Sequence, residues 1–170
     1  VIINGNIGDH GIAIMSARKG MELETPVVSD TCALNPMMMD LFLKQPQLHV
    51  LRDPTRGGLA SALNEISQSS ATGIILYENQ IPVTDGVRGA CEIMGFDPLY
   101  IANEGKILLI LPEAHADEAL TIMRSHEEGK ESRIIGRVTS VHPGILRLET
   151  TIGTTRIVDM ISGEQLPRIC

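Results

Sequence analysis

Apolar residues recur along this chain in two patterns, one typical of β-strands and the other of α-helices. Short runs in which most residues are apolar predict strands at 1–3, 49–52, 74–77, 106–111, 133–138, 145–148 and 156–158. Apolar residues three and four positions apart predict helices at 9–20, 35–43, 59–66, 84–94 and 113–124. Strands and helices interleave, and strands dominate towards the end. The pattern therefore predicts an α/β or α+β fold with helices packed on a sheet.

The same pattern predicts which side chains form the core. The strand expected at 106–111 is apolar throughout after its first residue, as is typical of a strand buried on both faces. Two helices show a continuous apolar face, formed by Leu59, Ala62, Leu63 and Ile66 in one and by Met38, Leu41 and Phe42 in the other. The methionine triplet at 37–39 favours adaptable core packing over a metal site. Asp9, and Thr84 or Asp85, are the expected helix N-caps.

Composition limits the class of protein. The 170 residues fit one domain, with 43% hydrophobic residues for a core that must be largely aliphatic because aromatic residues make up only 2%. A net charge of −7 and the scarcity of aromatic side chains argue against a nucleic-acid-binding protein. No apolar run approaches the roughly 20 residues of a membrane span. No signal-peptide pattern is visible, so we expect a cytoplasmic protein without membrane contact.

Three cysteines without a Cys-x-x-Cys spacing fit reduced thiols better than a disulfide framework or a zinc site. We expect Cys32 and Cys91 to be small core residues and predict no metal site. Cys170 differs because it is the last residue. A thiolate at the end of a tail can act as a nucleophile and tethered group carrier. Its own carboxylate opposes ionisation, so the sulfur would need a base or an electropositive pocket; an ordinary solvated chain end is the alternative.

The chain opens on Val1 and runs directly into an apolar, strand-like segment. This pattern resembles the middle of a longer protein. This observation limits how much of a function the chain can carry by itself.

Residues 53–60 form a candidate phosphate-binding loop between a predicted strand and a predicted helix. The relevant residues are Asp53, Thr55, Arg56, Gly57 and Gly58. Amide groups at a helix N-terminus bind anions, glycines permit close approach, and an arginine can bind phosphate through two hydrogen bonds. The spacing matches neither a Walker A loop nor a dinucleotide fingerprint, so a tight turn with a solvated Arg56 remains an alternative.

Two further polar positions lie next to predicted elements. Glu104 precedes the most apolar strand, where partial burial would suit a general base; a surface carboxylate is the alternative. Gly8, Asp9 and His10 precede the first helix, where His10 could contact phosphate or simply lie beside a helix cap.

Taken together, these segments resemble the C-terminal half of the HypE family, the carbamoyl dehydratases of nickel–iron hydrogenase maturation. The resemblance covers essentially the whole chain. It rests on segments 4–13, 29–30, 53–60, 103–105 and 167–170. The loop at 53–58 is shared with aminoimidazole ribonucleotide synthetase and selenophosphate synthetase, whereas the Pro-Arg-Ile-Cys ending is specific to the HypE family. The implied fold is an α/β sandwich with a mixed, mainly antiparallel sheet and partly ferredoxin-like topology. It comprises a domain at 1–162 and a tail at 163–170.

The resemblance also implies a mechanism. The carbamoyltransferase HypF would load Cys170, ATP with Mg²⁺ would activate the carbamoyl oxygen, and loss of phosphate would leave a thiocyanate. The cyano group would then pass to iron on a HypC–HypD complex. Glu104 is the expected base. The loop residues at 53–58 and, less directly, Gly8, Asp9 and His10 would face the nucleotide.

In this family ATP is bound chiefly by an N-terminal domain, which also forms the homodimer. We therefore expect this chain alone to be unable to catalyse dehydration. Two alternatives remain: an ATP-dependent synthetase in which Cys170 is incidental, and a non-enzymatic module whose tail docks a partner.

Overall fold

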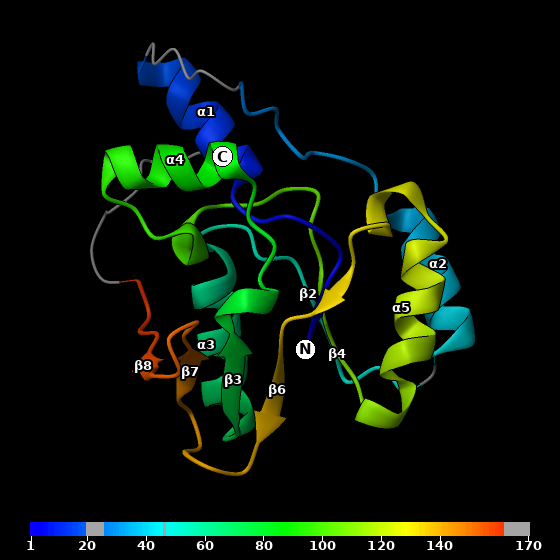
Figure 1. The fold of residues 1–170 in the computed structure, drawn as a ribbon. Coiled ribbons are helices and arrows are strands. Elements are labelled where there is room, and N and C mark those ends of the chain that lie inside the picture. Colours follow the sequence, from blue (N-terminus) through cyan, green and yellow to red (C-terminus); the bar gives the residue numbers. More distant parts are fainter. Residues whose placement is uncertain (20–25, 46, 162–170) are drawn as a thin grey trace.

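The computed structural model describes residues 1–19, 26–45 and 47–161, and within them the strands form two four-stranded sheets (Figure 1). The first sheet is antiparallel throughout. In spatial order it contains β2 (Val50–Arg52), β4 (Leu108–Ile110), β1 (Ile2–Ile3) and β5 (Arg133–Ile134). The second sheet contains β6 (Gly136–Thr139), β3 (Gly73–Tyr77), β7 (Leu146–Glu149) and β8 (Thr155–Ile157). Its β3–β7 pair is parallel and its other pairs are antiparallel.

The expected α/β class and mainly antiparallel pairing are confirmed, but the single sheet of the prediction is divided. The strand predicted at 133–138 bends at Ile135, so that β5 joins one sheet and β6 the other. The Ile135 N–H donates to the Val1 carbonyl oxygen at 2.9 Å, and the Ile135 carbonyl accepts from the Tyr77 N–H at 2.8 Å. This one residue therefore bonds to both sheets.

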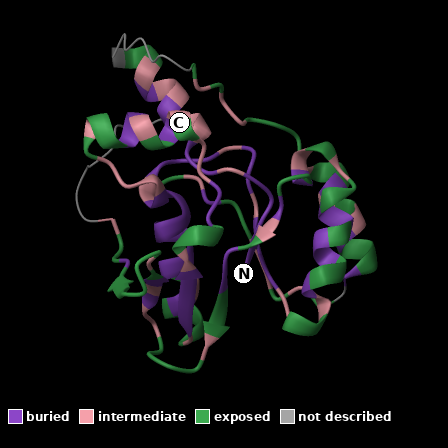
Figure 2. Ribbon diagram, viewed as in Figure 1, coloured by how far each residue is buried: buried purple, intermediate pink, exposed green. Residues whose placement is uncertain are grey.

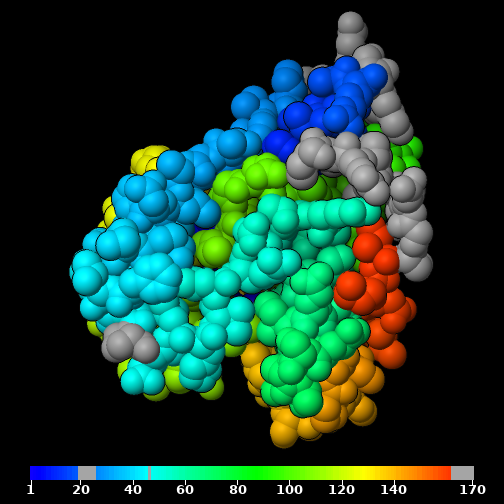
Figure 3. Space-filling view, turned by 180° about the vertical axis from the view of Figure 1, so that it is seen from behind, coloured from blue at the N-terminus to red at the C-terminus, as the bar shows by residue number. Residues whose placement is uncertain are grey.

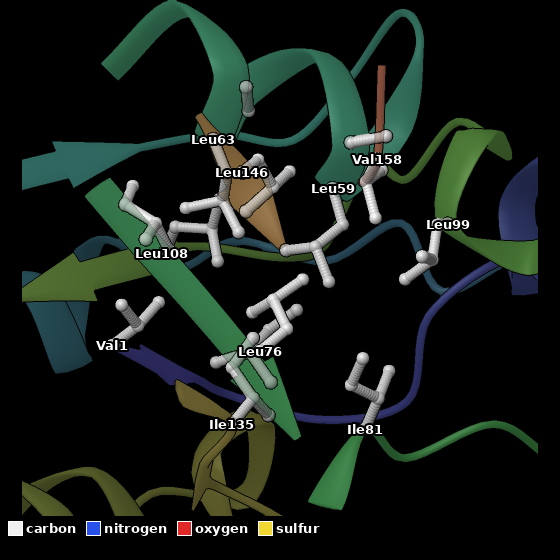
Figure 4. Close-up of a cluster of buried hydrophobic side chains, with 14 of the residues drawn as sticks. Val1, Leu59, Leu63, Leu76, Ile81, Leu99, Leu108, Ile135, Leu146 and Val158 are labelled. Atoms are coloured by element: carbon white, nitrogen blue, oxygen red, sulfur yellow. The ribbon is translucent and has the colours of Figure 1, made fainter. Parts of the chain in front are cut away.

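The main core fills the space between the sheets and helix α3 (Gly58–Ser70), as Figure 4 shows. Side-chain alternation explains its composition: Ile3, Leu108 and Ile110 point into this core. Their neighbours Ile2 and Leu109 point to the opposite face of the same sheet. The apolar face predicted for α3 is confirmed, because Leu59, Ala62 and Leu63 are buried and Ile66 packs against the core. The buried residues follow these central strands in Figure 2.

Helices α2 (Asn35–Lys44) and α5 (Ala116–Arg124) pack together over the outer face of the first sheet (Figure 1). The face predicted for α2 was partly wrong. Met37 and Leu41 are buried, whereas Phe42 is 56% exposed, because the side of α2 that meets α5 and the sheet carries Met37. The helix expected to begin at 113 begins instead as a 3₁₀ turn, η3 (Glu113–His115), that leads into α5.

A third cluster lies between α1 (Asp9–Lys19) and α4 (Asp85–Met94). Thr84 caps α4 by accepting the Val87 N–H at 3.3 Å, which confirms one of the two alternatives expected for this helix. The cap expected for α1 was wrong by one residue, because Asp9 is the first residue of the helix itself. Cys91 is buried here as expected, but the prediction for Cys32 was wrong. Cys32 is exposed, because it lies on the irregular segment that precedes α2. Among the described residues, no helix is long and apolar enough to cross a membrane.

Candidate functional site

Three of the segments selected from the sequence meet at the buried side chain of Asn103. Its Oδ1 accepts the Gly8 N–H at 2.7 Å. Its Nδ2 donates to the carbonyl oxygens of Pro54 at 2.9 Å and Ile101 at 3.0 Å. Asn103 is only 1% exposed, so these bonds do not compete with bulk water. The turn before α1 and the loop before α3 are thereby fixed beside the segment that carries Glu104.

A second buried asparagine holds the other side of Glu104. The Oδ1 of Asn4 accepts the Ile107 N–H at 2.8 Å, and its Nδ2 donates to the carbonyls of Gly105 at 3.1 Å and Glu128 at 3.0 Å. Glu104 therefore lies between two backbone positions that buried amides fix, and it is itself half-buried. This rigid backbone is what a general base requires for reproducible orientation.

The loop at 53–58 makes a tight turn that packs closely against the neighbouring backbone. Gly57 and Gly58 have φ angles of 74° and 60°, the left-handed region that favours glycine. A Cβ atom on Gly58 would lie 2.6 Å from the Leu99 carbonyl oxygen and 2.5 Å from that of Ile101. The loop is thus pressed against η2 (Pro98–Tyr100) at the start of α3.

Polar groups around this loop suit an anion. Arg56 is exposed, and α3 begins at this loop, where the helix dipole favours an anion. The first amide of the helix is already bonded, because the Gly58 N–H donates to the Thr55 carbonyl oxygen at 3.0 Å. Asp53 is also exposed and lies 3.5 Å from the Arg52 guanidinium. Sequence reasoning missed Ser61, whose hydroxyl is buried beside Gly57 and has no hydrogen-bond partner among the described residues. Nothing in its sequence context distinguishes it from an ordinary helix serine.

Gly8, Asp9 and His10 form the entrance to α1. The Asp9 carboxylate accepts from the Thr84 hydroxyl at 3.3 Å, and His10 Nδ1 lies 2.9 Å from the Ser29 hydroxyl oxygen. Burial, and secondarily the charge of Asp30, raises the pKa of Asp9, although Lys106 and Thr84 oppose the shift. These groups therefore gather around the 29–31 segment, which the resemblance had singled out only at Ser29 and Asp30.

A buried ion pair lies next to Glu104 in the sequence. Lys106 Nζ and Asp30 Oδ2 are 2.9 Å apart, with side chains only 10% and 7% exposed. The Asp30 backbone passes so close to Gly105 that a Cβ there would lie 1.9 Å from the Asp30 carbonyl oxygen. Sequence reasoning assigned no role to Lys106; a lysine at the start of an otherwise apolar run was the available signal.

Together, these contacts bring a possible anion site, the segment that carries Glu104 and a buried ion pair close to one part of the surface. In Figure 3 the yellow-green segment near residue 100 is recessed between the blue, cyan and teal segments. The described residues contain no group of three or more His, Cys, Asp or Glu side chains able to hold a metal ion. Cys170, the expected nucleophile, lies outside the described residues.

Comparison with known proteins decides the family. Residues 1–149 match the family model of the AIR synthase related protein, C-terminal domain. The chain belongs to this family. The match spans both sheets as far as β7 and includes the loop before α3.

The similar curated proteins are about twice as long. The chain is 46% identical over 170 residues to the carbamoyl dehydratase HypE of Azotobacter vinelandii, covering 100% of the chain and 50% of that protein. It is 47% identical over 169 residues to HypE of Rhodobacter capsulatus, covering 99% of the chain and 50% of that protein. The chain therefore spans about half the length of these relatives.

Solved structures agree with the family assignment. A crystal structure of the hydrogenase maturation protein HypE superposes with a TM-score of 0.95 at 44% identity, over 99% of this chain and 55% of that one. HypE in complex with ATP superposes with a TM-score of 0.94 at 43% identity, over 99% and 52%. Thiamine monophosphate kinase from Aquifex aeolicus, at 17% identity and a TM-score of 0.62, shares the fold alone.

Proposed function

We propose that this chain is the C-terminal domain of a HypE-type carbamoyl dehydratase that acts in hydrogenase maturation. The observation that carries the proposal is the 46% identity to such a dehydratase, because the match covers the whole chain and so includes the segment ending in Cys170. The convergence of three motifs at Asn103 supports it, since a rigid site has been built from residues far apart in sequence.

The proposed chemistry takes place on the Cys170 sulfur. The carbamoyltransferase HypF transfers a carbamoyl group to this sulfur, and the thiol proton is released. The carbamoyl oxygen attacks the γ-phosphorus of ATP, and ADP leaves. As the nitrogen loses its two protons, its electrons form the C≡N bond, the C–O bond breaks and phosphate departs. The thiocyanate that remains is the donor of the cyano group to iron on a HypC–HypD complex.

Several described residues fit parts of this reaction. Arg56, the glycines at 57 and 58, and the Thr55 segment would face the phosphates, and the unpartnered Ser61 hydroxyl supplies a further donor at the same place. Glu104 would accept protons from the carbamoyl nitrogen, as the half-buried carboxylate held between Asn4 and Asn103. Asp53, Gly8, Asp9 and His10 would line the approach to the nucleotide.

Other parts of the proposal rest on relatives. A solved HypE–HypF complex, similar to this chain with a TM-score of 0.90 at 46% identity, supports HypF as the partner. The ATP complex of HypE supports ATP as the co-substrate. Because the described residues offer no cluster of three metal-binding side chains, Mg²⁺ would enter on ATP and find its other ligands in water or the upstream domain. That domain would also make most of the contacts to ATP and form a homodimer.

The test is the intact mass of the protein after incubation with HypF, carbamoyl phosphate and ATP. It uses this chain and a version extended by the upstream half found in the relatives. Both should gain a carbamoyl adduct, and only the extended version should convert it to a cyano adduct. Cys170→Ala should abolish both products. Cys32→Ser is the matched control, because Cys32 is also an exposed thiol and should be dispensable.

Glu104→Gln in the extended version tests the assigned base. It should leave carbamoyl loading intact and stop or strongly slow conversion to the cyano adduct, because the amide cannot accept a proton. If neither version of the protein gains an adduct, the proposal is wrong. ATP hydrolysis that survives Cys170→Ala unchanged would favour a synthetase of the wider superfamily, and retained binding of HypF without chemistry would favour a docking module.

A further inference from the structure

The first two residues after β8, Val158 and Asp159, are each bonded to the body of the protein through their carbonyl groups. Val158 is 1% exposed, and its N–H donates to the Leu146 carbonyl at 2.9 Å. Its own carbonyl accepts from Nδ2 of Asn64, on α3, at 2.8 Å. The next carbonyl, that of Asp159, accepts from the Tyr100 hydroxyl at 2.9 Å. One buried amide and one phenol thus hold consecutive residues.

Further contacts carry this segment to the candidate phosphate loop. Within β8, Arg156 pairs with Asp97 at 2.5 Å, and the Asp97 side chain also caps η2 by accepting the Leu99 N–H at 3.0 Å. At the other end of the segment, Ile161 lies beside Gly57: a Cβ atom on Gly57 would be 3.5 Å from Ile161 Cγ2. The described chain therefore reaches the loop at 53–58 just where the terminal segment begins.

The element η2 connects these two features. Its carbonyl groups form the surface against which Gly58 is pressed, and its Tyr100 side chain holds Asp159. Asn64 lies on α3, the helix that begins at this loop. The loop and the root of the terminal segment, which we define as residues 158–161, are thus held by the same two elements. Their relative position is set by short hydrogen bonds and backbone packing.

We propose that Asn64 and Tyr100 are positioning residues that anchor the root of the Cys170-bearing segment at the phosphate loop. This inference rests on the proposed function, in which Cys170 must bring a carbamoyl oxygen to ATP. Cys170 is the ninth residue after Ile161, and nine residues at about 3.3 Å each reach at most roughly 30 Å. Anchoring the tether at the loop therefore keeps the sulfur at high effective concentration near the phosphates.

The expected size of the effect follows from tether length. Without the Tyr100 bond, the last residue held by hydrogen bonds is Val158, which stays bonded to Leu146 and Asn64, so the tether lengthens from nine to 12 residues. Effective concentration falls with at least the −3/2 power of tether length, which corresponds to about a 1.5-fold loss. Moving the fixed point away from the loop at 53–58 would increase this loss. In Tyr100→Phe we expect conversion of the carbamoyl to the cyano adduct to slow by roughly 1.5- to fivefold.

Tyr100→Phe in the extended protein is the primary test, because it removes only the hydroxyl and keeps the ring. Carbamoyl loading by HypF and the KM for ATP should remain unchanged, while the first-order conversion rate at saturating ATP falls. Tyr77→Phe, the same change at the only other tyrosine, should leave the rate unaltered. Asn64→Ala should have a larger effect, although loss of its buried bonds also weakens folding, so the interpretation rests on Tyr100→Phe.

Hydrogen exchange separates this inference from the proposed function. Independently of any chemistry, Tyr100→Phe should speed amide exchange in the peptide that contains residues 158–161, and Tyr77→Phe should not. Unchanged exchange in Tyr100→Phe would disprove the anchoring. Faster exchange with an unchanged conversion rate would disprove its role in the reaction. If the wild-type protein forms no adduct at all, the proposed function is wrong while the exchange result still decides whether Tyr100 anchors the root.

Discussion

At the scale of single residues, Asn103 makes the most consequential polar contacts in the candidate site. Asn103→Ala would leave the Gly8 N–H and the Pro54 and Ile101 carbonyls without their side-chain partner in a buried region. A buried polar group left unpaired costs about 1–3 kcal/mol. We expect the free energy of unfolding to fall by about 3 kcal/mol in total, measured by urea denaturation. The bonds reach segments far apart in sequence, so loss of activity should exceed what instability explains.

A second asparagine provides a matched control, because it shows what replacing asparagine by alanine costs without the buried hydrogen bonds of Asn103. Asn79, in η1 (Glu78–Gln80), is exposed, so Asn79→Ala should change the free energy of unfolding by less than about 0.5 kcal/mol. Equal losses in the two variants would show that the contacts of Asn103 do not stabilise the protein.

Asn103 also shows where reasoning from sequence stopped. The segment 103–105 was selected for Glu104 and for a family resemblance, and Asn103 itself was given no role. No local sequence pattern indicates that its amide bonds to residues 95 and 49 positions away. Ser61 and Lys106 were missed for the same reason, since their surroundings are created by packing between distant segments. The Cys32 prediction failed because residue type alone favours burial, whereas exposure follows from the path of the irregular segment that carries it.

At the scale of elements, the junction between α3 and η2 depends on Gly58. Gly58→Ala would place a Cβ 2.5 Å from the Ile101 carbonyl oxygen, and the residue has a φ of 60°. That Cβ would also lie 2.6 Å from the Leu99 carbonyl oxygen, which is part of η2, so the clash can be relieved only by moving η2 or the loop. We expect a loss of about 2–4 kcal/mol in the free energy of unfolding, as found for substitutions that overpack rigid sites. Urea denaturation measures it.

Gly89 is the control for this element-scale prediction. It lies inside α4, and a Cβ there meets nothing within 4 Å. Gly89→Ala should therefore be neutral or stabilise the protein by up to about 1 kcal/mol, because alanine favours the helix. A Gly58→Ala variant as stable as Gly89→Ala would show that the α3–η2 junction tolerates a wider separation than its geometry indicates.

Most elements were predictable because their apolar periodicity reflects burial on one side, as in α3, or on both sides, as in β4. The division into two sheets was not. It depends on Ile135, an apolar residue whose backbone bonds to Tyr77 in β3 and to Val1, the residue directly before β1. Side-chain type does not encode where a strand bends when both halves remain buried. The face of α2 was misjudged for a related reason, since Met37 and Phe42 are equally apolar and only the position of α5 distinguishes them.

At the scale of the whole molecule, the segment leading into β1 is joined to β6 through the Val1 nitrogen, which in the 170-residue chain is a free amino group. This group donates to the Gly136 carbonyl at 2.9 Å, and burial lowers its pKa from 8.0 to about 6. The folded protein thus favours the neutral amine, whereas the unfolded chain binds a proton already near pH 8. Stability should therefore be greatest above pH 8 and fall as the pH drops towards 6, where the loss levels off.

Urea denaturation of the 170-residue chain between pH 8.5 and 5.5 would measure this dependence. A two-unit shift corresponds to about 2–3 kcal/mol. Histidines titrate in the same window, so the comparison is with a version carrying one additional residue before Val1, in which an uncharged amide replaces the amine. The difference in unfolding free energy between the two should grow as the pH falls from 8 to 6. Only the Val1 amine of the 170-residue chain takes up a proton on unfolding in this range, because burial keeps it neutral in the folded state. A difference independent of pH would mean that the amine of the 170-residue chain lies in water and is not buried against Gly136.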